Sequence, residues 1–144
     1  AIFFDMLTKS QEKILVESIQ NAELNTSGEI KVHIEATCEI DPMERAKVVF
    51  EHLGLQKTEQ KNAVLIYWAY QSRKFAILGD SGINQVVPSN FWDSTKETMR
   101  SFFKKDQFVE GIAAAVTEAG QQLKTYFPYD SNDVNEISDD ISIG

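Results

Sequence analysis

Oxygen-bearing side chains in glycine-containing segments are the residues of this 144-residue chain with the clearest capacity for chemistry. Asp80 and Asn84 lie in the segment Gly-Asp-Ser-Gly-Ile-Asn, and Asp93 follows it closely. Glu29 and Asn62 each come just before an apolar stretch. Carboxylate, amide and carbonyl oxygens are the ligands that hard cations such as Ca²⁺ prefer. These five residues are therefore candidate ligands of a divalent cation, Ca²⁺ or else Mg²⁺.

The same residues also have ordinary structural uses. Asp80 and Asn84 are of types that stabilise turns through side-chain hydrogen bonds to the backbone. Asp93 suits the first turn of a helix, where a carboxylate complements the helix dipole. Spacing alone leaves both interpretations open.

Other catalytic patterns are absent from the sequence. It contains no glycine-rich phosphate-binding motif and no Gly-x-Ser-x-Gly nucleophile motif. Cys38 is the only cysteine, which excludes an internal disulfide, and we expect it to be an unreactive residue at a strand end. His33 and His52 lack the spacing of metal ligands.

Composition and charge narrow the class of protein. Hydrophobic residues make up 42% and charged residues 25% of the chain, as in a soluble globular domain. The formal net charge of −8 argues against nucleic acid as a partner, since phosphate binding needs a basic surface. No apolar run reaches the roughly 18 residues of a membrane helix, so we expect no transmembrane segment and a cytoplasmic or peripheral location.

The C-terminal residues carry much of the excess negative charge. Residues 128–144 contain no lysine or arginine, and their acidic residues are Asp130, Asp133, Glu136, Asp139 and Asp140. Scattered apolar residues without a sustained period predict a flexible acidic tail that is dispensable for folding, with a short strand pairing at 134–143 as the alternative. The folded domain is then expected to span residues 1–127.

Hydrophobic periodicity predicts the elements that must position the oxygen ligands. Helices are expected at about 9–24, from Pro42 to Gly54, from about Asn90 and from Asp106; strands are expected at about 30–36, 63–69 and 74–78. The first strand alternates apolar and polar residues, so we expect one of its faces to be less buried and the strand not to be central. The second is apolar almost throughout, as expected of a strand covered on both faces.

The order of these elements predicts where the candidate ligands lie. A right-handed crossover through the helix that begins at Pro42 makes the first two strands parallel, and the third returns antiparallel. The starts of the first two strands and the end of the third then meet at one edge of the sheet. We therefore expect Glu29, Asn62 and Asp80 to converge in an α/β sandwich.

The segments that carry these residues resemble the TPM domain family. The matching segments are 27–32, 62–67, 79–83, 87–88, 91–92 and 108–112. The ending at 133–139 resembles that of the short, stand-alone bacterial members. No single segment is specific, but their order and spacing cover nearly the whole chain.

The resemblance implies a three-layer α/β/α sandwich around a small mixed β-sheet, with a divalent-cation site, usually for Ca²⁺, at one sheet edge. Asp80 matches the polar or acidic position after the strand-end glycine of the family. Asn62 matches its asparagine before the central strand, and Glu29 matches the start of the first strand. Asn84 and Ser89 stand where many members have carboxylates, which should weaken cation binding.

Three functions are consistent with this sequence. We predict a non-catalytic module whose loops are ordered by the bound cation. One alternative is a metal-assisted acid phosphatase acting on phosphate monoesters, an activity that the resemblance implies for some members, although these loops lack paired carboxylates and a basic phosphate clamp. The other is a metal-independent protein-interaction domain with an unidentified partner. No catalytic residue or organic cofactor is predicted.

Overall fold

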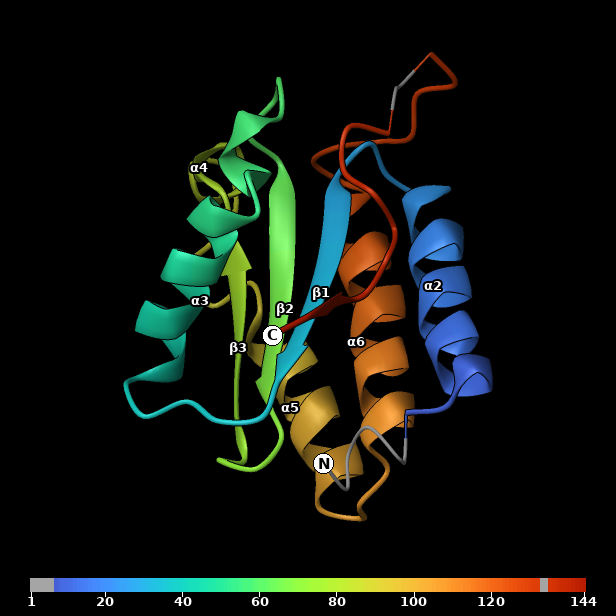
Figure 1. Cartoon of the computed structure of the whole chain (residues 1–144). Helices are drawn as coiled ribbons and strands as arrows, with labels where there is room; N and C mark the ends of the chain where they lie inside the picture. The colour runs from blue at the N-terminus through green and yellow to red at the C-terminus, as the bar shows by residue number, and fades with distance from the viewer. Residues whose placement is uncertain (1–6, 133–134) are drawn as a thin grey trace.

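The computed structural model describes residues 7–132 and 135–144. Its elements, in chain order, are α2 (Lys9–Glu23), β1 (Glu29–Glu35), α3 (Pro42–His52), the 3-10 helix η1 (Leu55–Lys57), β2 (Ala63–Ala69), β3 (Lys74–Gly79), α4 (Ser81–Asn84), α5 (Asp93–Phe103), α6 (Phe108–Leu123) and β4 (Ser142–Ile143). Figure 1 shows how they are arranged.

The described strands form one mixed sheet in the order β3-β2-β1-β4. β1 is parallel to β2 and to β4, whereas β2 and β3 are antiparallel. Glu29 is paired with Ala63, and Val64 with Gly79. The starts of β1 and β2 therefore meet the end of β3 at one edge of the sheet, as expected from the sequence.

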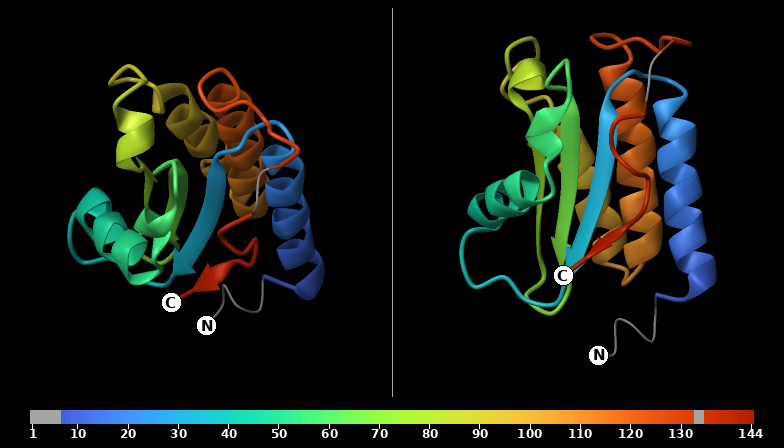
Figure 2. Two further views of the ribbon diagram at one scale, coloured as in Figure 1. Left: turned by 90° about the horizontal axis from the view of Figure 1, so that it is seen from above. Right: turned by 45° about the horizontal axis from the view of Figure 1, so that its top comes forward.

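Helices cover both faces of the sheet. α3 lies on one face and α2, α5 and α6 lie on the other (Figures 1 and 2). Two separate clusters of buried apolar side chains correspond to these faces. Ile30 and Val64 belong to the cluster with α2 and α6, and Leu65 belongs to the cluster with α3. The three-layer α/β/α sandwich is confirmed.

Helix starts follow the signals in the sequence where a capping residue is present. Thr8 and Gln11 form a reciprocal capping box at α2, and the Asp41 side chain accepts hydrogen bonds from two backbone amides at the start of α3. α6 begins later than expected because Asp106 has a left-handed backbone (φ 57°) that cannot belong to a helix. No helix among residues 7–132 and 135–144 is both long and apolar enough to cross a membrane.

The sequence prediction for β1 was wrong. All seven of its residues are buried, and the strand lies between β2 and β4. The polar side chains that alternate along it are not exposed to solvent. They bind groups of the protein instead, and the C-terminal residues supply many of those groups.

Residues 135–144, the C-terminal strap, pack along β1 and end in β4 (Figure 1). Lys31 Nζ donates to the carbonyl oxygens of Ser138 (3.2 Å) and Asp140 (2.8 Å). Ile141 is buried in the core with 7% of its surface exposed. Residues 135–144 are therefore packed against β1 and do not form the flexible tail expected from the sequence. The alternative expectation, a short strand pairing in this segment, holds. Residues 133–134 of that expected tail lie outside the described residues.

Candidate functional site

Asp80 lies at the sheet edge where β3 ends and α4 begins. Its backbone N–H donates to the Ala63 carbonyl (2.9 Å), which fixes it beside the start of β2. Its Oδ1 accepts a hydrogen bond from the Ser81 backbone N–H (2.7 Å) and so caps α4. Its Oδ2 is buried and has no hydrogen-bond partner among the described residues. Burying a carboxylate oxygen without a hydrogen-bond partner costs free energy. The capping of α4 accounts for Oδ1 but not for Oδ2.

Asp80 opens onto a cavity of about 360 Å³ between α3, η1 and α4, which we call the Asp80 pocket. The pocket is lined by Lys47, Phe50, Glu51, Gln56, Leu78, Gly79, Asp80, Ser81 and Asn84. Gln56 Oε1 is also buried and also lacks a hydrogen-bond partner within the described ranges. Two residues from separate elements that line this pocket therefore each have an oxygen acceptor without a hydrogen-bond partner among the described residues, and such oxygens are the donors that a hard cation requires.

The charges around the Asp80 pocket are mixed. Glu51 adds a second carboxylate to its lining, and Lys47 adds one ammonium group. Lys47 Nζ is bonded to Glu44 Oε1 at 3.2 Å on the exposed side of α3. A cation in the pocket would thus meet two carboxylates and one partly compensated positive charge, which suits moderate rather than tight binding.

Close packing of α4 holds this part of the site in place. A Cβ atom at Gly82 would lie 2.2 Å from the Gln60 carbonyl oxygen and 2.5 Å from that of Lys61, so only glycine fits there. Asn84 Nδ2 donates to the Gly79 carbonyl at 3.0 Å and closes the turn. Gly82 therefore serves close packing against the preceding loop rather than loop flexibility.

The other predicted ligands lie outside the Asp80 pocket. Asn62 is 2% exposed, and its Nδ2 donates to the Ser27 carbonyl at 3.3 Å, which ties the starts of β2 and β1 together. Glu29 Oε1 accepts from the backbone N–H of Glu136 in the strap (2.8 Å). Asp93 is an exposed residue in the first turn of α5. The structure therefore brings Asp80 and Asn84 into one pocket and puts the other three side chains elsewhere.

Glu29 lines a second cavity, of about 260 Å³, together with Glu23 and Asp139. Burial and a hydrogen bond with Asp139 raise the pKa of Glu23 to about 10, so this carboxyl is protonated at neutral pH. Glu23 Oε2 also accepts from the Ile30 backbone N–H at 3.0 Å. Glu23 therefore connects α2 to β1 through the Ile30 amide and to the strap through its hydrogen bond with Asp139. No group of three or more His, Cys, Asp or Glu side chains in the described parts of the chain has an arrangement suited to a metal ion.

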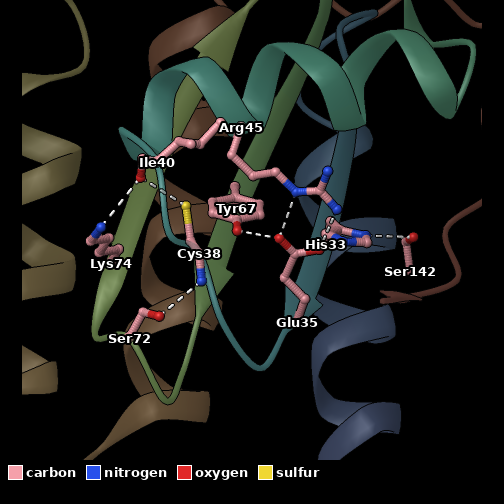
Figure 3. Close-up of polar contacts among 9 residues, drawn as sticks. All are labelled: His33, Glu35, Cys38, Ile40, Arg45, Tyr67, Ser72, Lys74 and Ser142. Carbon is pink, nitrogen blue, oxygen red and sulfur yellow. Dashed lines mark hydrogen bonds and ion pairs between the residues drawn. The ribbon is translucent and has the colours of Figure 1, made fainter.

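A buried polar network on the α3 face of the sheet was not predicted from the sequence. Glu35 accepts two hydrogen bonds from Arg45, at 2.8 Å from Nε and 2.9 Å from Nη2, and it also binds the Tyr67 hydroxyl (Figure 3). His33 Nε2 lies 3.0 Å from Glu35 Oε1, and its Nδ1 lies 2.7 Å from Ser142 Oγ. The network therefore connects β1, α3, β2 and the strap.

Electrostatics fix the protonation states in this network. Burial by itself raises the pKa of Glu35, but hydrogen bonds from Arg45, Tyr67 and His33 outweigh it and hold that pKa at about 2. Burial lowers the pKa of His33, so the ring is neutral at neutral pH. Because an ionised Glu35 is matched by Arg45, the network is a satisfied structural unit. The alternation of polar residues in β1 was its only signal in the sequence.

Comparisons with known proteins agree with this architecture. The family model of the TPM domain matches residues 3–122. The NMR structure of the BA42 protein from the psychrophilic bacterium Bizionia argentinensis is similar over 95% of this chain and 94% of that one, with 44% identity and a TM-score of 0.90. The N-terminal domain of the cg2496 protein from Corynebacterium glutamicum shares the fold, with 12% identity, a TM-score of 0.64 and coverage of 88% and 78%. A search of curated proteins gives no significant match.

Proposed function

We propose that this chain, which belongs to the TPM domain family, is a non-catalytic module that binds a divalent cation, Ca²⁺ or Mg²⁺, in the Asp80 pocket. The main support for this proposal is that Asp80 Oδ2 is a buried carboxylate oxygen without a hydrogen-bond partner in the described structure. A bound cation would satisfy this oxygen and remove the cost of leaving it unpaired.

The proposed ligands come from three elements around the pocket. Asp80 Oδ2 supplies a charged oxygen, and Gln56 Oε1 supplies a neutral one that is likewise unpaired within residues 7–132 and 135–144. Glu51 and Asn84 line the same pocket and bring further oxygens, with water completing the shell. With so few carboxylates, we expect a dissociation constant of about 10⁻⁵–10⁻³ M, the range of weak calcium modules.

Lys47 provides a second, independent test of the proposed cation site. Its ammonium group lines the pocket and opposes a bound cation through like-charge repulsion. Its bond to Glu44 is an exposed ion pair and contributes little to stability. Removing this positive charge should therefore tighten cation binding without harming the fold.

We do not extend the proposal to phosphate-ester hydrolysis. Metal-assisted hydrolysis needs groups that hold the phosphoryl oxygens and a water or side chain placed to attack. The lining of the Asp80 pocket offers one cationic side chain, Lys47, and that side chain is bonded to Glu44. Asp80 Oδ1 is occupied as the cap of α4. Cation binding alone leaves both the Lys47–Glu44 ion pair and the Asp80 Oδ1 cap of α4 in place.

Calorimetric titration of Ca²⁺ and of Mg²⁺ tests the proposal. The Asp80→Asn variant keeps an oxygen for the cap of α4 and loses the charge, so we expect at least tenfold weaker binding. Asp93→Asn removes the same charge outside the pocket and should bind like the wild type, whereas Lys47→Gln should bind about threefold more tightly. Wild-type affinity in Asp80→Asn, or lost affinity in Asp93→Asn, would contradict the proposed site.

A further inference from the structure

A cavity of about 720 Å³ lies at the opposite end of the sheet from Asp80. It opens between the β2–β3 turn and the loop that joins α5 to α6, and its volume is within the usual range for small-molecule sites. The lining residues that matter for its chemistry are Trp68, Phe75, Phe103 and Phe108 in the wall and Arg73 and Lys104 at the rim.

Aromatic rings form the wall of this cavity, which we call the aromatic cavity. The Trp68 and Phe108 rings are stacked, with centroids 4.8 Å apart. Phe103 lies 5.2 Å from Trp68 and meets Phe75 edge-on at 5.7 Å. Phe75, Phe103 and Phe108 are only half-buried, so they offer ring surface to an incoming molecule. A flat apolar group would gain both area burial and stacking here.

The rim of the aromatic cavity is positively charged. It carries the cationic residues Arg73, Arg100 and Lys104 and the single carboxylate of Asp106. Arg100 is partly committed, since it pairs with Glu97 at 3.2 Å and lies over the Phe75 ring at 5.4 Å. Arg73 and Lys104 form no ion pair with any described residue. In a chain of net charge −8, this local excess of cations favours an anionic ligand.

The backbone of both rim loops is unusual. Arg73 (φ 54°) and Asp106 (φ 57°) adopt the left-handed conformation, which non-glycine residues rarely adopt and which costs free energy. The third such residue in the described chain, Lys61, belongs to the Asp80 end of the sheet. Both positions have a local structural reason, since Arg73 ends the β2–β3 turn and Asp106 follows α5, where the Gln107 N–H donates to the Phe102 carbonyl. These conformations fix the course of the two loops that form the rim.

We propose that the aromatic cavity binds a small organic anion with a flat apolar body, of the aromatic carboxylate or sulfonate class. The rings of the ligand lie against Phe108 and Phe103, and its acidic group lies between Arg73 and Lys104. Apolar contact provides the attraction and the rim charges select for the anion. This site is separate from the Asp80 pocket, and its failure would leave the proposed cation binding intact.

The full chain can be tested with a matched pair of probes. 8-Anilinonaphthalene-1-sulfonate carries the negative charge, and N-phenyl-1-naphthylamine has the same rings without it. The two tryptophans report the place of binding, because Trp68 lines the cavity whereas the Trp92 Nε1 atom lies near Gly79 at the other end of the sheet. We expect saturable sulfonate binding at one site, with an NMR shift of the Trp68 indole N–H and none of Trp92.

Rim variants test the charge selection. Arg73→Gln combined with Lys104→Gln should weaken sulfonate binding about fivefold and leave the neutral probe unchanged, since two exposed charge contacts are lost. Lys57→Gln combined with Lys124→Gln makes the same charge change on exposed residues at the other end of the sheet, and should have no such effect. Equal sulfonate affinity in both double variants would overturn the proposal. So would a shift of Trp92 in place of Trp68, or no saturable binding because another part of the chain fills the cavity.

Discussion

Replacing Ile141 with alanine should destabilise the domain by about 2–3 kcal/mol. Ile141 is 7% exposed and belongs to the core cluster on the α2 and α6 side of the sheet. Truncation of a buried isoleucine to alanine costs about 2–5 kcal/mol through lost burial and the cavity left behind. We take the lower part of that range because Ile141 lies next to a two-residue edge strand, where neighbouring side chains can adjust. For a domain of this size the melting temperature should fall by about 7–10 °C.

Urea denaturation followed by circular dichroism measures this loss, and Ile143→Ala is the matched control. Ile143 is in the same short strand but is 43% exposed, so its truncation should cost less than about 1 kcal/mol. Equal stability of the two variants, with both close to the wild type, would contradict this prediction. That result would mean that the strap contributes no packing to the fold and that the flexible tail expected from composition was the better description.

Three further predictions concern the loop at Gly82, the Glu35 network and catalysis. Gly82→Ala should cost at least about 2 kcal/mol and weaken Ca²⁺ binding, because its Cβ would lie 2.2 Å from the Gln60 carbonyl oxygen; thermal denaturation and calorimetry would show both effects. The wild type should lose stability as the pH falls from about 4.5 to about 2, since the folded-state pKa of Glu35 (about 2) lies below its ordinary 4.5 and the unfolded chain takes up the proton first. In Glu35→Gln, urea titrations across that range should show lower stability at neutral pH and a flatter pH dependence. Hydrolysis of p-nitrophenyl phosphate with Ca²⁺ or Mg²⁺ should stay at the buffer rate, and robust turnover that disappears in Asp80→Asn would show the non-catalytic assignment to be wrong.

Most of the fold could be predicted because its signals are local. The capping box at Thr8 and the Asp41-Pro42 pair mark helix starts by hydrogen bonds that their own side chains make. The apolar run of β2 and the turn after it predicted the pairing with β3, and the crossover rule predicted the parallel pairing with β1. Each of these inferences depended on residues close together in the sequence or on chain topology.

The role of the C-terminal residues could not be predicted in the same way. Lys31 and His33 alternate with apolar residues along β1 and were expected to lie on a less buried face, because polar side chains on a strand usually face water. In the folded chain both of them bind groups of the strap more than a hundred positions away. Hydrogen bonds between single polar groups that are far apart in the sequence produce no periodic pattern in either segment, so the sequence alone does not predict them.

The candidate site was predictable only in part. The sequence identified Asp80 and Asn84, and the structure brings both into one pocket. Glu29 and Asn62 were expected to join them because the backbone places all these residues at one edge, but their side chains are engaged elsewhere by the strap and by the Ser27 carbonyl. Gln56 was missed, since an amide in a short 3-10 helix has no distinguishing pattern and only its unpaired oxygen reveals it.

The most direct test of the cation site is an NMR titration of the ¹⁵N-labelled full chain with CaCl₂. We expect saturable amide shifts at residues 47–56 and 79–85, which surround the Asp80 pocket, and their loss in Asp80→Asn. Shifts confined to the acidic residues of 128–144, or shifts around the pocket that persist unchanged in Asp80→Asn, would contradict the proposed site.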